Sequence, residues 1–201
     1  MRLVPHSLLN LSAVERFSKP FDYFLSPQAL REDVSTTLLA WLETEAPWKL
    51  VETDFYEQYE FSFWDVDVPP QLLVLREPDF LNELKTKIEN LFKVELGNDI
   101  DVAAHRLIPG QRIRLHNDFI AGQKTYRLLI QLNQGCKDKD GGLLLLFNSA
   151  DPADIHRVFR PIHNDAIGFV VSPTSNHAVS LLHGGERFTL VYSFYGKNGN
   201  G

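Results

Sequence analysis

Four polar side chains in the C-terminal half of the sequence have types and spacings that suit chemistry at a metal ion. His116 and Asp118 are two residues apart, His177 follows sixty-one residues after His116, and Arg187 lies ten residues further on. Two imidazoles and a carboxylate on one face of Fe(II) leave the opposite positions open for a co-substrate and O₂. A guanidinium binds a carboxylate through two parallel hydrogen bonds. These four groups are therefore able to hold Fe(II) and a dicarboxylate, the combination that a non-heme iron oxygenase requires.

The residues around this motif form a series of short apolar or alternating runs separated by Gly, Pro, Asp and Asn. Runs of this length, bounded by turn-forming residues, are typical of β-strands. Eight such strands favour a mainly β jelly roll, in which the second and seventh strands face each other across the mouth of the barrel. In that layout His116 and Asp118 leave the second strand where His177 enters the seventh. The predicted strands are 102–108, 112–116, 126–132, 141–147, 157–160, 167–171, 177–182 and 187–195.

A His-x-Asp triplet occurs twice in the sequence. The positions of the two copies among the predicted strands indicate which copy supplies the metal ligands. His163-Asn164-Asp165 repeats the letters of His116-Asn117-Asp118. Only one predicted strand separates the second copy from His177, which is too little chain for the jelly-roll arrangement. We therefore predict that His163-Asn164-Asp165 forms the turn between the fifth and sixth strands and that the first copy supplies the metal ligands.

This combination of motif and strand order resembles the 2-oxoglutarate and Fe(II)-dependent oxygenase superfamily, specifically its prolyl-hydroxylase-like branch. The resemblance covers residues 100–196. It implies a double-stranded β-helix, a cupin-like barrel, in which His116, Asp118 and His177 bind iron and form the catalytic centre. It also implies that 2-oxoglutarate chelates the metal through its 1-carboxylate and 2-keto oxygen, while its far carboxylate pairs with Arg187. Some members of the branch use lysine at this position, so Arg187 is a variant within the pattern.

Strand periodicity suggests further residues that bind the co-substrate, because alternate side chains point to the same face of a strand. Thr189 shares a face with Arg187, so its hydroxyl is a candidate donor to the same carboxylate. Arg114 shares a face with His116 and Asp118 if the strand is regular, which makes it a candidate for binding a carboxylate of substrate or co-substrate. An outward-facing arginine is the alternative, because a bulge before the motif would reverse its direction.

The third predicted strand begins with Tyr126 and Arg127, one of which must point into the barrel. Either side chain is a candidate for lining the pocket, and we include Tyr126 among the candidate co-substrate-binding residues; ordinary strand positions are the alternative. The other histidines fall in turns, at the start of a strand or within a strand, and are not predicted to bind the metal. They are His6, His105, His156 and His183.

The sequence predicts a single structural domain made of two parts and a short tail. Residues 1–99 are expected to supply helices and a sheet extension that pack on the barrel, and residues 100–196 are expected to form the double-stranded β-helix core. Residues 197–201 are rich in Gly and Asn and are expected to be disordered. A chain of 201 residues is long enough to bury one hydrophobic core.

Two helices are expected ahead of the barrel. Ser26-Pro27 is typical of a helix start, and Pro78-Asp79 is expected to begin the second helix. The apolar stripe that follows Ser26-Pro27 should pack on the outside of the sheet. Between the helices, residues 48–75 are rich in aromatic and acidic side chains. We interpret this segment as one or two strands that extend the larger sheet, or alternatively as a flap that covers the substrate.

Composition limits the partners and the compartment of the protein. The formal net charge is −6 and there is no cluster of Lys and Arg, which argues against a nucleic-acid partner. No apolar run is long enough to cross a bilayer, and the first residues lack the apolar region of a secretory signal. Cys136 is the one cysteine, so it has no partner for an internal disulfide. We therefore expect a cytoplasmic protein without membrane partners; the sequence leaves the oligomeric state open.

The resemblance implies hydroxylation of an unactivated C–H bond, coupled to decarboxylation of 2-oxoglutarate to succinate and CO₂. Related halogenases have a small residue in place of Asp118, so the carboxylate favours hydroxylation; desaturation and ring closure use the same ligands and stay open. The expected substrate is an amino acid, free or within a peptide, and a small natural-product scaffold is the alternative. A cupin-like protein that does not use 2-oxoglutarate is a further alternative, but it leaves Arg187 and Thr189 unexplained.

Overall fold

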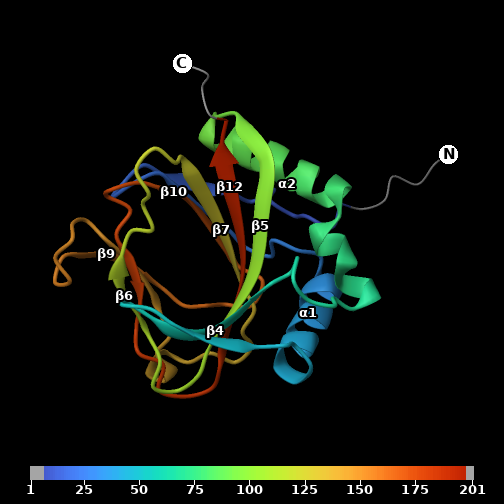
Figure 1. The fold of residues 1–201 in the computed structure, drawn as a ribbon. Coiled ribbons are helices and arrows are strands. Elements are labelled where there is room, and N and C mark those ends of the chain that lie inside the picture. Colours follow the sequence, from blue (N-terminus) through green and yellow to red (C-terminus); the bar gives the residue numbers. More distant parts are fainter. Residues whose placement is uncertain (1–6, 198–201) are drawn as a thin grey trace.

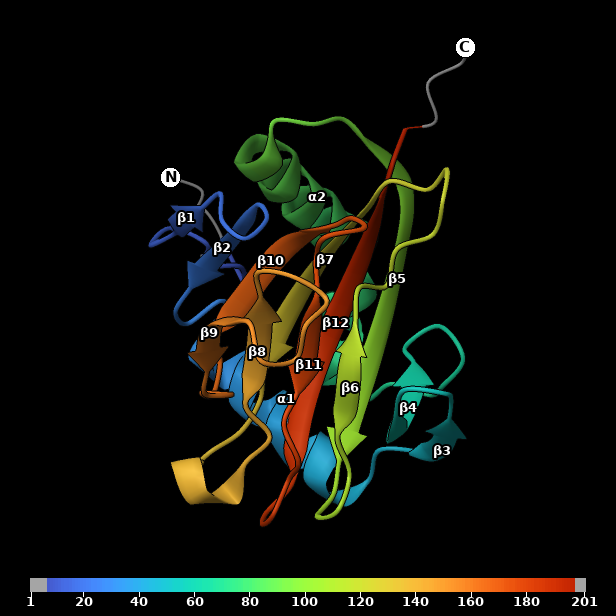
Figure 2. The same cartoon turned by 90° about the vertical axis from the view of Figure 1, so that its left-hand side faces the viewer.

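The structure is a computed structural model that describes residues 7–197, and these form two antiparallel β-sheets that pack face to face (Figure 1). The turned view shows the smaller sheet lying in front of the larger one (Figure 2). The strands of the larger sheet, in spatial order, are β1 (Glu15–Phe17), β2 (Tyr23–Ser26), β10 (Ala166–Val171), β7 (Thr125–Gln131), β12 (Arg187–Gly196), β5 (Leu96–Leu107), β4 (Glu57–Ser62) and β3 (Lys49–Glu52). Those of the smaller sheet are β6 (Ile113–His116), β11 (His177–Val179), β8 (Leu144–Phe147) and β9 (Ile155–Phe159).

The eight predicted barrel strands correspond to β5 through β12, and their arrangement in two sheets is the predicted double-stranded β-helix. One detail of the predicted layout is wrong. The second and seventh barrel strands, β6 and β11, do not face each other across the mouth but pair directly within the smaller sheet, with His177 opposite His116. Backbone pairing between neighbouring strands therefore brings these two histidines together.

The central strand of the larger sheet, β12, has one face toward the helices and the other toward the space between the sheets. Leu190 and Tyr192 are buried in the hydrophobic core beneath the helices. Arg187 and Thr189, at the alternate positions, line a cavity between the sheets. The apolar positions of β12 thus anchor the strand, and this fixes the direction in which the polar positions point.

Two α-helices cover the outer face of the larger sheet, where Figure 1 shows them beside β5. They are α1 (Glu32–Thr44) and α2 (Pro78–Phe92), and the chain also has two short 3₁₀ helices, η1 (Pro70–Arg76) and η2 (Asp138–Asp140). α2 begins at Pro78 as predicted. The prediction for α1 was wrong at its start, because Ser26 pairs with Ala166 as the last residue of β2, and the chain becomes helical only at Glu32. The apolar stripe of α1, including Leu38 and Trp41, is buried in the core as expected.

The N-terminal region extends both edges of the larger sheet. β3 and β4, from the aromatic segment 48–75, pair with each other, and β4 pairs with β5, as predicted for a sheet extension. β1 and β2 were not predicted and extend the opposite edge through pairing with β10. The tail that was expected to be disordered lies outside the described residues, apart from Lys197. None of the helices in the described part of the chain is both long and apolar enough to cross a membrane.

The second His-x-Asp triplet, His163-Asn164-Asp165, forms the predicted turn between β9 and β10. Asn164 has a positive φ of 64°. The backbone N–H of Leu30 donates to Asn164 Oδ1 at 2.9 Å, and Asn164 Nδ2 donates to the carbonyl oxygen of Leu30 at 2.6 Å. This copy of the motif therefore ties the N-terminal segment to the barrel.

Candidate metal centre

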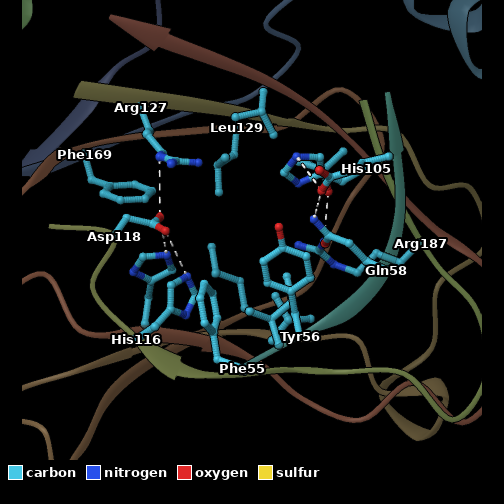
Figure 3. Close-up of a pocket in the computed structure, with 17 residues that line it drawn as sticks. Phe55, Tyr56, Gln58, His105, His116, Asp118, Arg127, Leu129, Phe169 and Arg187 are labelled. Carbon is cyan, nitrogen blue, oxygen red and sulfur yellow. Dashed lines mark hydrogen bonds and ion pairs between the residues drawn. The ribbon is translucent and has the colours of Figure 1, made fainter. Parts of the chain in front are cut away.

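Three side chains form the candidate metal site. His116 is the last residue of β6, Asp118 follows two residues later, and His177 is the first residue of β11. One ligand atom from each of His116, Asp118 and His177 can be chosen so that all three lie within 4.8 Å of one another. His116 Nε2 lies 3.5 Å from Asp118 Oδ1, and His177 Nε2 lies 3.4 Å from Asp118 Oδ2. Figure 3 shows the His116 ring and the Asp118 carboxylate together at one end of a cavity. Within residues 7–197, this is the group of His, Cys, Asp and Glu side chains that is arranged to hold a metal ion.

Backbone carbonyl groups orient both imidazoles. His116 Nδ1 lies 2.8 Å from the carbonyl oxygen of Arg114, and His177 Nδ1 lies 2.8 Å from that of Ser175. A carbonyl oxygen only accepts hydrogen bonds, so each Nδ1 is placed to donate, and each Nε2 is the ring nitrogen that is left to bind a metal. Two Nε2 atoms and one carboxylate are a donor set that fits Fe(II).

The protonation states of two ligands also fit a metal. Burial raises the pKa of Asp118, but the interactions with the His116 and His177 side chains and the positive charge of Arg127 outweigh burial and lower this pKa overall. Burial lowers the pKa of His177 below its usual value. The site therefore contains an ionised carboxylate and a neutral imidazole before any metal binds.

Arg187 lies on β12 and is buried without an acidic partner among the described residues. Its Nε donates to the carbonyl oxygen of Gly142 at 2.9 Å, and its Nη1 donates to Thr189 Oγ1 at 2.9 Å. Burial lowers the pKa of Arg187 to about 10, so the guanidinium stays charged at neutral pH. A buried cation without a counter-ion is costly, which makes this end of the cavity suited to bind an anion.

A row of polar side chains crosses the larger sheet beside Arg187. The strand register places Glu60 opposite His105, His105 opposite Thr189, and Thr189 opposite Gln131. Thr189 Oγ1 donates to Gln131 Oε1 at 3.2 Å, while it accepts from Arg187. Burial, followed by the charges of the cavity arginines, lowers the pKa of His105 to about 3, so this histidine is neutral. Sequence reasoning did not assign a role to Gln131 or Glu60, although both occupy inward-facing strand positions.

The cavity between the sheets has a volume of about 270 Å³ and contains both the triad and Arg187. Besides these residues, its walls include apolar side chains such as Phe169 and Leu129, as well as the charged Arg127 (Figure 3). The structure thus brings five of the seven sequence-predicted site residues to one cavity. They are His116, Asp118, His177, Arg187 and Thr189.

The other two candidates, Arg114 and Tyr126, are not in this cavity, so their prediction is corrected. β6 has a register shift relative to β11, because Val179 pairs with Ile113 while His177 pairs with His116. The shift reverses the alternation, so Ile113 lines the cavity and Arg114 lies outside it.

Tyr126 faces the opposite side of the larger sheet from the cavity. Its ring centroid lies 5.4 Å from that of Phe92 of α2, within the hydrophobic core. On β7 it is therefore Arg127 that points inward.

The turn between β3 and β4 reaches the metal site. Phe55 stacks on His116, with ring centroids 4.6 Å apart and an interplanar angle of 28°. Tyr56 forms an isolated bridge with Ile113, and Figure 3 shows its hydroxyl directed toward the middle of the cavity. The aromatic segment therefore extends the sheet and also supplies part of the cavity wall.

Comparisons with known proteins agree with this geometry. Residues 102–195 match the family model described as the 2OG-Fe(II) oxygenase superfamily. A search of curated proteins finds no match. Among solved structures, the chain is similar to a Pseudomonas putida prolyl-4-hydroxylase, with 17% identity and a TM-score of 0.70 over 87% of this chain and 92% of that chain.

Two further structures show the same fold. One is a Trichoplax adhaerens prolyl hydroxylase in complex with a peptide fragment of the hypoxia inducible factor oxygen degradation domain, with 11% identity and a TM-score of 0.67 over 87% of this chain and 84% of that chain. The other is a viral collagen prolyl hydroxylase from Paramecium bursaria Chlorella virus-1 in a 2-oxoglutarate complex, with 16% identity and a TM-score of 0.61 over 87% of this chain and 96% of that chain.

The fold, the triad and the family match together define the class of this protein. Residues 102–195 match the 2OG-Fe(II) oxygenase superfamily and contain the triad, and their fold is similar to that of prolyl hydroxylases. This part of the chain thus has the fold and the ligand set of a non-heme dioxygenase, in a family that uses Fe(II), 2-oxoglutarate and O₂.

Proposed function

We propose that the protein hydroxylates an unactivated C–H bond of an amino acid, free or within a peptide. In this proposal His116, Asp118 and His177 bind iron, and Arg187 binds the far carboxylate of 2-oxoglutarate. The observation that carries it is the buried guanidinium of Arg187, which has no carboxylate partner in the described part of the chain and shares one cavity with the triad. The similarity to prolyl hydroxylases, one of which was determined with a bound peptide, supports an amino-acid residue as the substrate.

Hydrogen bonds hold the residues that would bind the co-substrate in place. Arg187 is fixed through Gly142 and Thr189, and the Thr189 hydroxyl is fixed in turn because it donates to Gln131. A guanidinium whose position is set before binding loses little conformational entropy when a carboxylate arrives. Thr189 and Gln131 thus act as positioning residues for Arg187.

Bound iron supplies the activation of O₂, coupled to decarboxylation of 2-oxoglutarate to succinate and CO₂. Asp118 and the two histidines would hold the metal, and they line the same cavity as Arg187. Apolar side chains on the cavity wall, including Ile113, Leu129 and Phe169, limit the access of water to this space. The protein therefore contributes binding, orientation and exclusion of water.

A cupin-like protein that binds metal without 2-oxoglutarate is the main alternative at the level of chemistry. In such a protein the buried charge of Arg187 would have no anion to neutralise it. A small natural-product scaffold is the alternative at the level of the substrate, and product analysis separates it from an amino acid.

The experiment is to reconstitute the protein with Fe(II), supply 2-oxoglutarate under isotopically labelled O₂, and measure both succinate and labelled product. Free amino acids, short peptides and small heterocycles serve as candidate substrates, and His177→Ala is the control without a complete triad. We expect slow succinate formation that a substrate of the amino-acid or peptide class accelerates, with label in the product. Succinate formation that none of these accelerates, or label in a heterocycle alone, would contradict the proposal.

A further inference from the structure

Arg127 is a second cation in the cavity, and the binding of iron and 2-oxoglutarate described above leaves it without a role. Its Nε is buried and forms no hydrogen bond within residues 7–197. This atom lies 3.4 Å from Asp118 Oδ2, which is close enough for attraction between charges but long for a hydrogen bond. Figure 3 shows the guanidinium projecting from β7 into the cavity, beside Asp118 and Phe169.

Metal binding would weaken the one ion pair that Arg127 forms within residues 7–197. Asp118 is a ligand in the triad, so a bound divalent ion takes up much of its negative charge. Arg127 would then need another anion to balance its charge. Its terminal nitrogens form no hydrogen bond in the described part of the chain, so they are available to bind a carboxylate side by side.

The charges of the cavity restrict the net charge of a further ligand. Two acidic and two basic side chains line the cavity, namely Glu60, Asp118, Arg127 and Arg187, and their formal charges cancel. Fe(II) and doubly ionised 2-oxoglutarate also cancel. A third molecule with no net charge therefore fits the loaded cavity better than an anion or a cation, because uncompensated charge in an apolar space is costly.

Charge balance also restricts the other groups of such a molecule. A molecule with no net charge that offers Arg127 a carboxylate must also carry a cationic group. An ammonium group on the same molecule meets this condition.

We propose that Arg127 binds the carboxylate of a zwitterionic substrate, a free aliphatic amino acid. This inference rests on the proposed function and narrows its substrate class. An internal residue of a peptide has neither charge on its backbone, so it leaves Arg127 uncompensated. The apolar wall near the triad, including Phe55, Leu129 and Phe169, provides contacts for an aliphatic side chain.

The test measures binding rather than turnover. The anaerobic protein is loaded with Fe(II) and 2-oxoglutarate, and the visible charge-transfer band of the chelated keto acid is recorded first without any amino acid. L-Valine, L-leucine, L-isoleucine and L-proline are then titrated, each beside its amide and its N-acetyl form. We expect at least one free amino acid to shift the band, and both blocked forms of it to bind at least about tenfold more weakly, because each blocked form carries a net charge that the loaded cavity does not compensate.

Arg127→Gln, with Arg114→Gln as the matched control, assigns the carboxylate contact. Arg114 lies outside the cavity, where its Nη1 donates to the carbonyl oxygen of Asp54 at 3.4 Å. We expect Arg127→Gln to weaken binding of the free amino acid at least about tenfold, with 2-oxoglutarate affinity nearly unchanged, and Arg114→Gln to change neither. Because the blocked ligands test the same contact in the wild-type protein, the inference stays falsifiable if Arg127→Gln does not fold.

Three results would overturn the inference. They are a band that no free amino acid shifts, blocked forms that bind as tightly as the free amino acid, and an Arg127→Gln variant that keeps full affinity for it. If the band does not form at all in the wild-type protein, the proposed function fails, and the inference fails with it. The first recording therefore separates the two failures.

Discussion

His116 and His177 make the same backbone hydrogen bond but have different surroundings. His177 is buried, and Phe169 meets its ring edge-on at a centroid distance of 5.0 Å. His116 is partly exposed and is covered by Phe55. Both rings are thus held by a carbonyl group on one side and an aromatic ring on the other, so the ligand atoms are oriented before the metal arrives.

Replacement of Arg187 tests how the co-substrate is bound. We expect Arg187→Gln to weaken 2-oxoglutarate binding by about tenfold to a hundredfold, since a charge-assisted hydrogen bond contributes about 1.5–3 kcal/mol. Fe(II) affinity should change little, because Arg187 does not contact the triad. Co-substrate titration of the anaerobic iron-loaded protein measures the effect, with Arg114→Gln as the control. Equal affinity of Arg187→Gln and wild type would argue against the assigned role.

At the scale of elements, the loop that precedes β8 supports Arg187. Gly142 has a positive φ of 65°, and a Cβ at this position would lie 2.9 Å from Leu182 Cδ1 and 3.2 Å from Arg187 Cδ. Its carbonyl oxygen also accepts the hydrogen bond from Arg187 Nε. Glycine is therefore required both for the backbone conformation and for the close approach of Arg187.

Gly142→Ala should lower stability and displace Arg187. We expect a loss of about 1–2 kcal/mol in the free energy of unfolding, the cost of a left-handed conformation for a residue with a Cβ, together with weaker 2-oxoglutarate binding. Gly110→Ala is the matched control, because Gly110 also has a positive φ, 95°, but a Cβ there would meet no atom within 4 Å. Denaturant unfolding and co-substrate titration distinguish the two variants. If both variants lose co-substrate affinity equally, contact with Arg187 is not the cause.

The β3–β4 hairpin contributes to the metal site through Phe55. Removing a stacked aromatic side chain costs about 0.5–1.5 kcal/mol beyond the loss of buried area. We therefore expect Phe55→Ala to weaken Fe(II) affinity by about threefold to tenfold. Leu50→Ala, at an exposed position of β3, should leave the affinity unchanged. A competition assay with a coloured chelator measures both, and an unchanged affinity for Phe55→Ala would show that the stacking does not stabilise the site.

At the scale of the whole molecule, the barrel and the metal triad could be predicted because their signals are local. Each barrel strand is a short apolar or alternating run between turn residues, and α2 begins at a proline. The His-x-Asp motif and the distal His177 needed only the strand order to be placed together. Strands β1 and β2 were not predicted because they are short and form only through long-range pairing, β2 with β10 and β1 with β2.

The errors at the site come from register, which a single sequence does not reveal. Arg114 was assigned by regular alternation, and the register shift in β6 turned it outward. Tyr126 and Arg127 are neighbours on a strand, so one of them had to face the cavity, but the sequence did not show which. Packing of Tyr126 against α2 leaves Arg127 facing the cavity. Glu60 belongs to a strand outside the barrel motif, so only the pairing of β4 with β5 places it in the cavity.

Metal binding should stabilise the whole fold, because the ligands come from two different strands and exist together only in the folded state. At a free Fe(II) concentration one hundred times the Kd, linkage predicts a gain of about 2.7 kcal/mol. For a domain of this size that corresponds to an increase in Tm of about 5–10 °C. Anaerobic thermal unfolding with and without a chelator measures the change, and His177→Ala should show little of it. An equal increase in that variant would place the bound iron elsewhere.

An anaerobic titration of metal-free protein with Fe(II) and 2-oxoglutarate, followed by visible absorption, tests the metal and co-substrate assignments most directly. We expect the weak charge-transfer band of a chelated keto acid in the wild-type protein and no such band in His177→Ala. Tight iron binding without a band would contradict the assignment of 2-oxoglutarate, and it would leave a barrel that binds metal for another purpose.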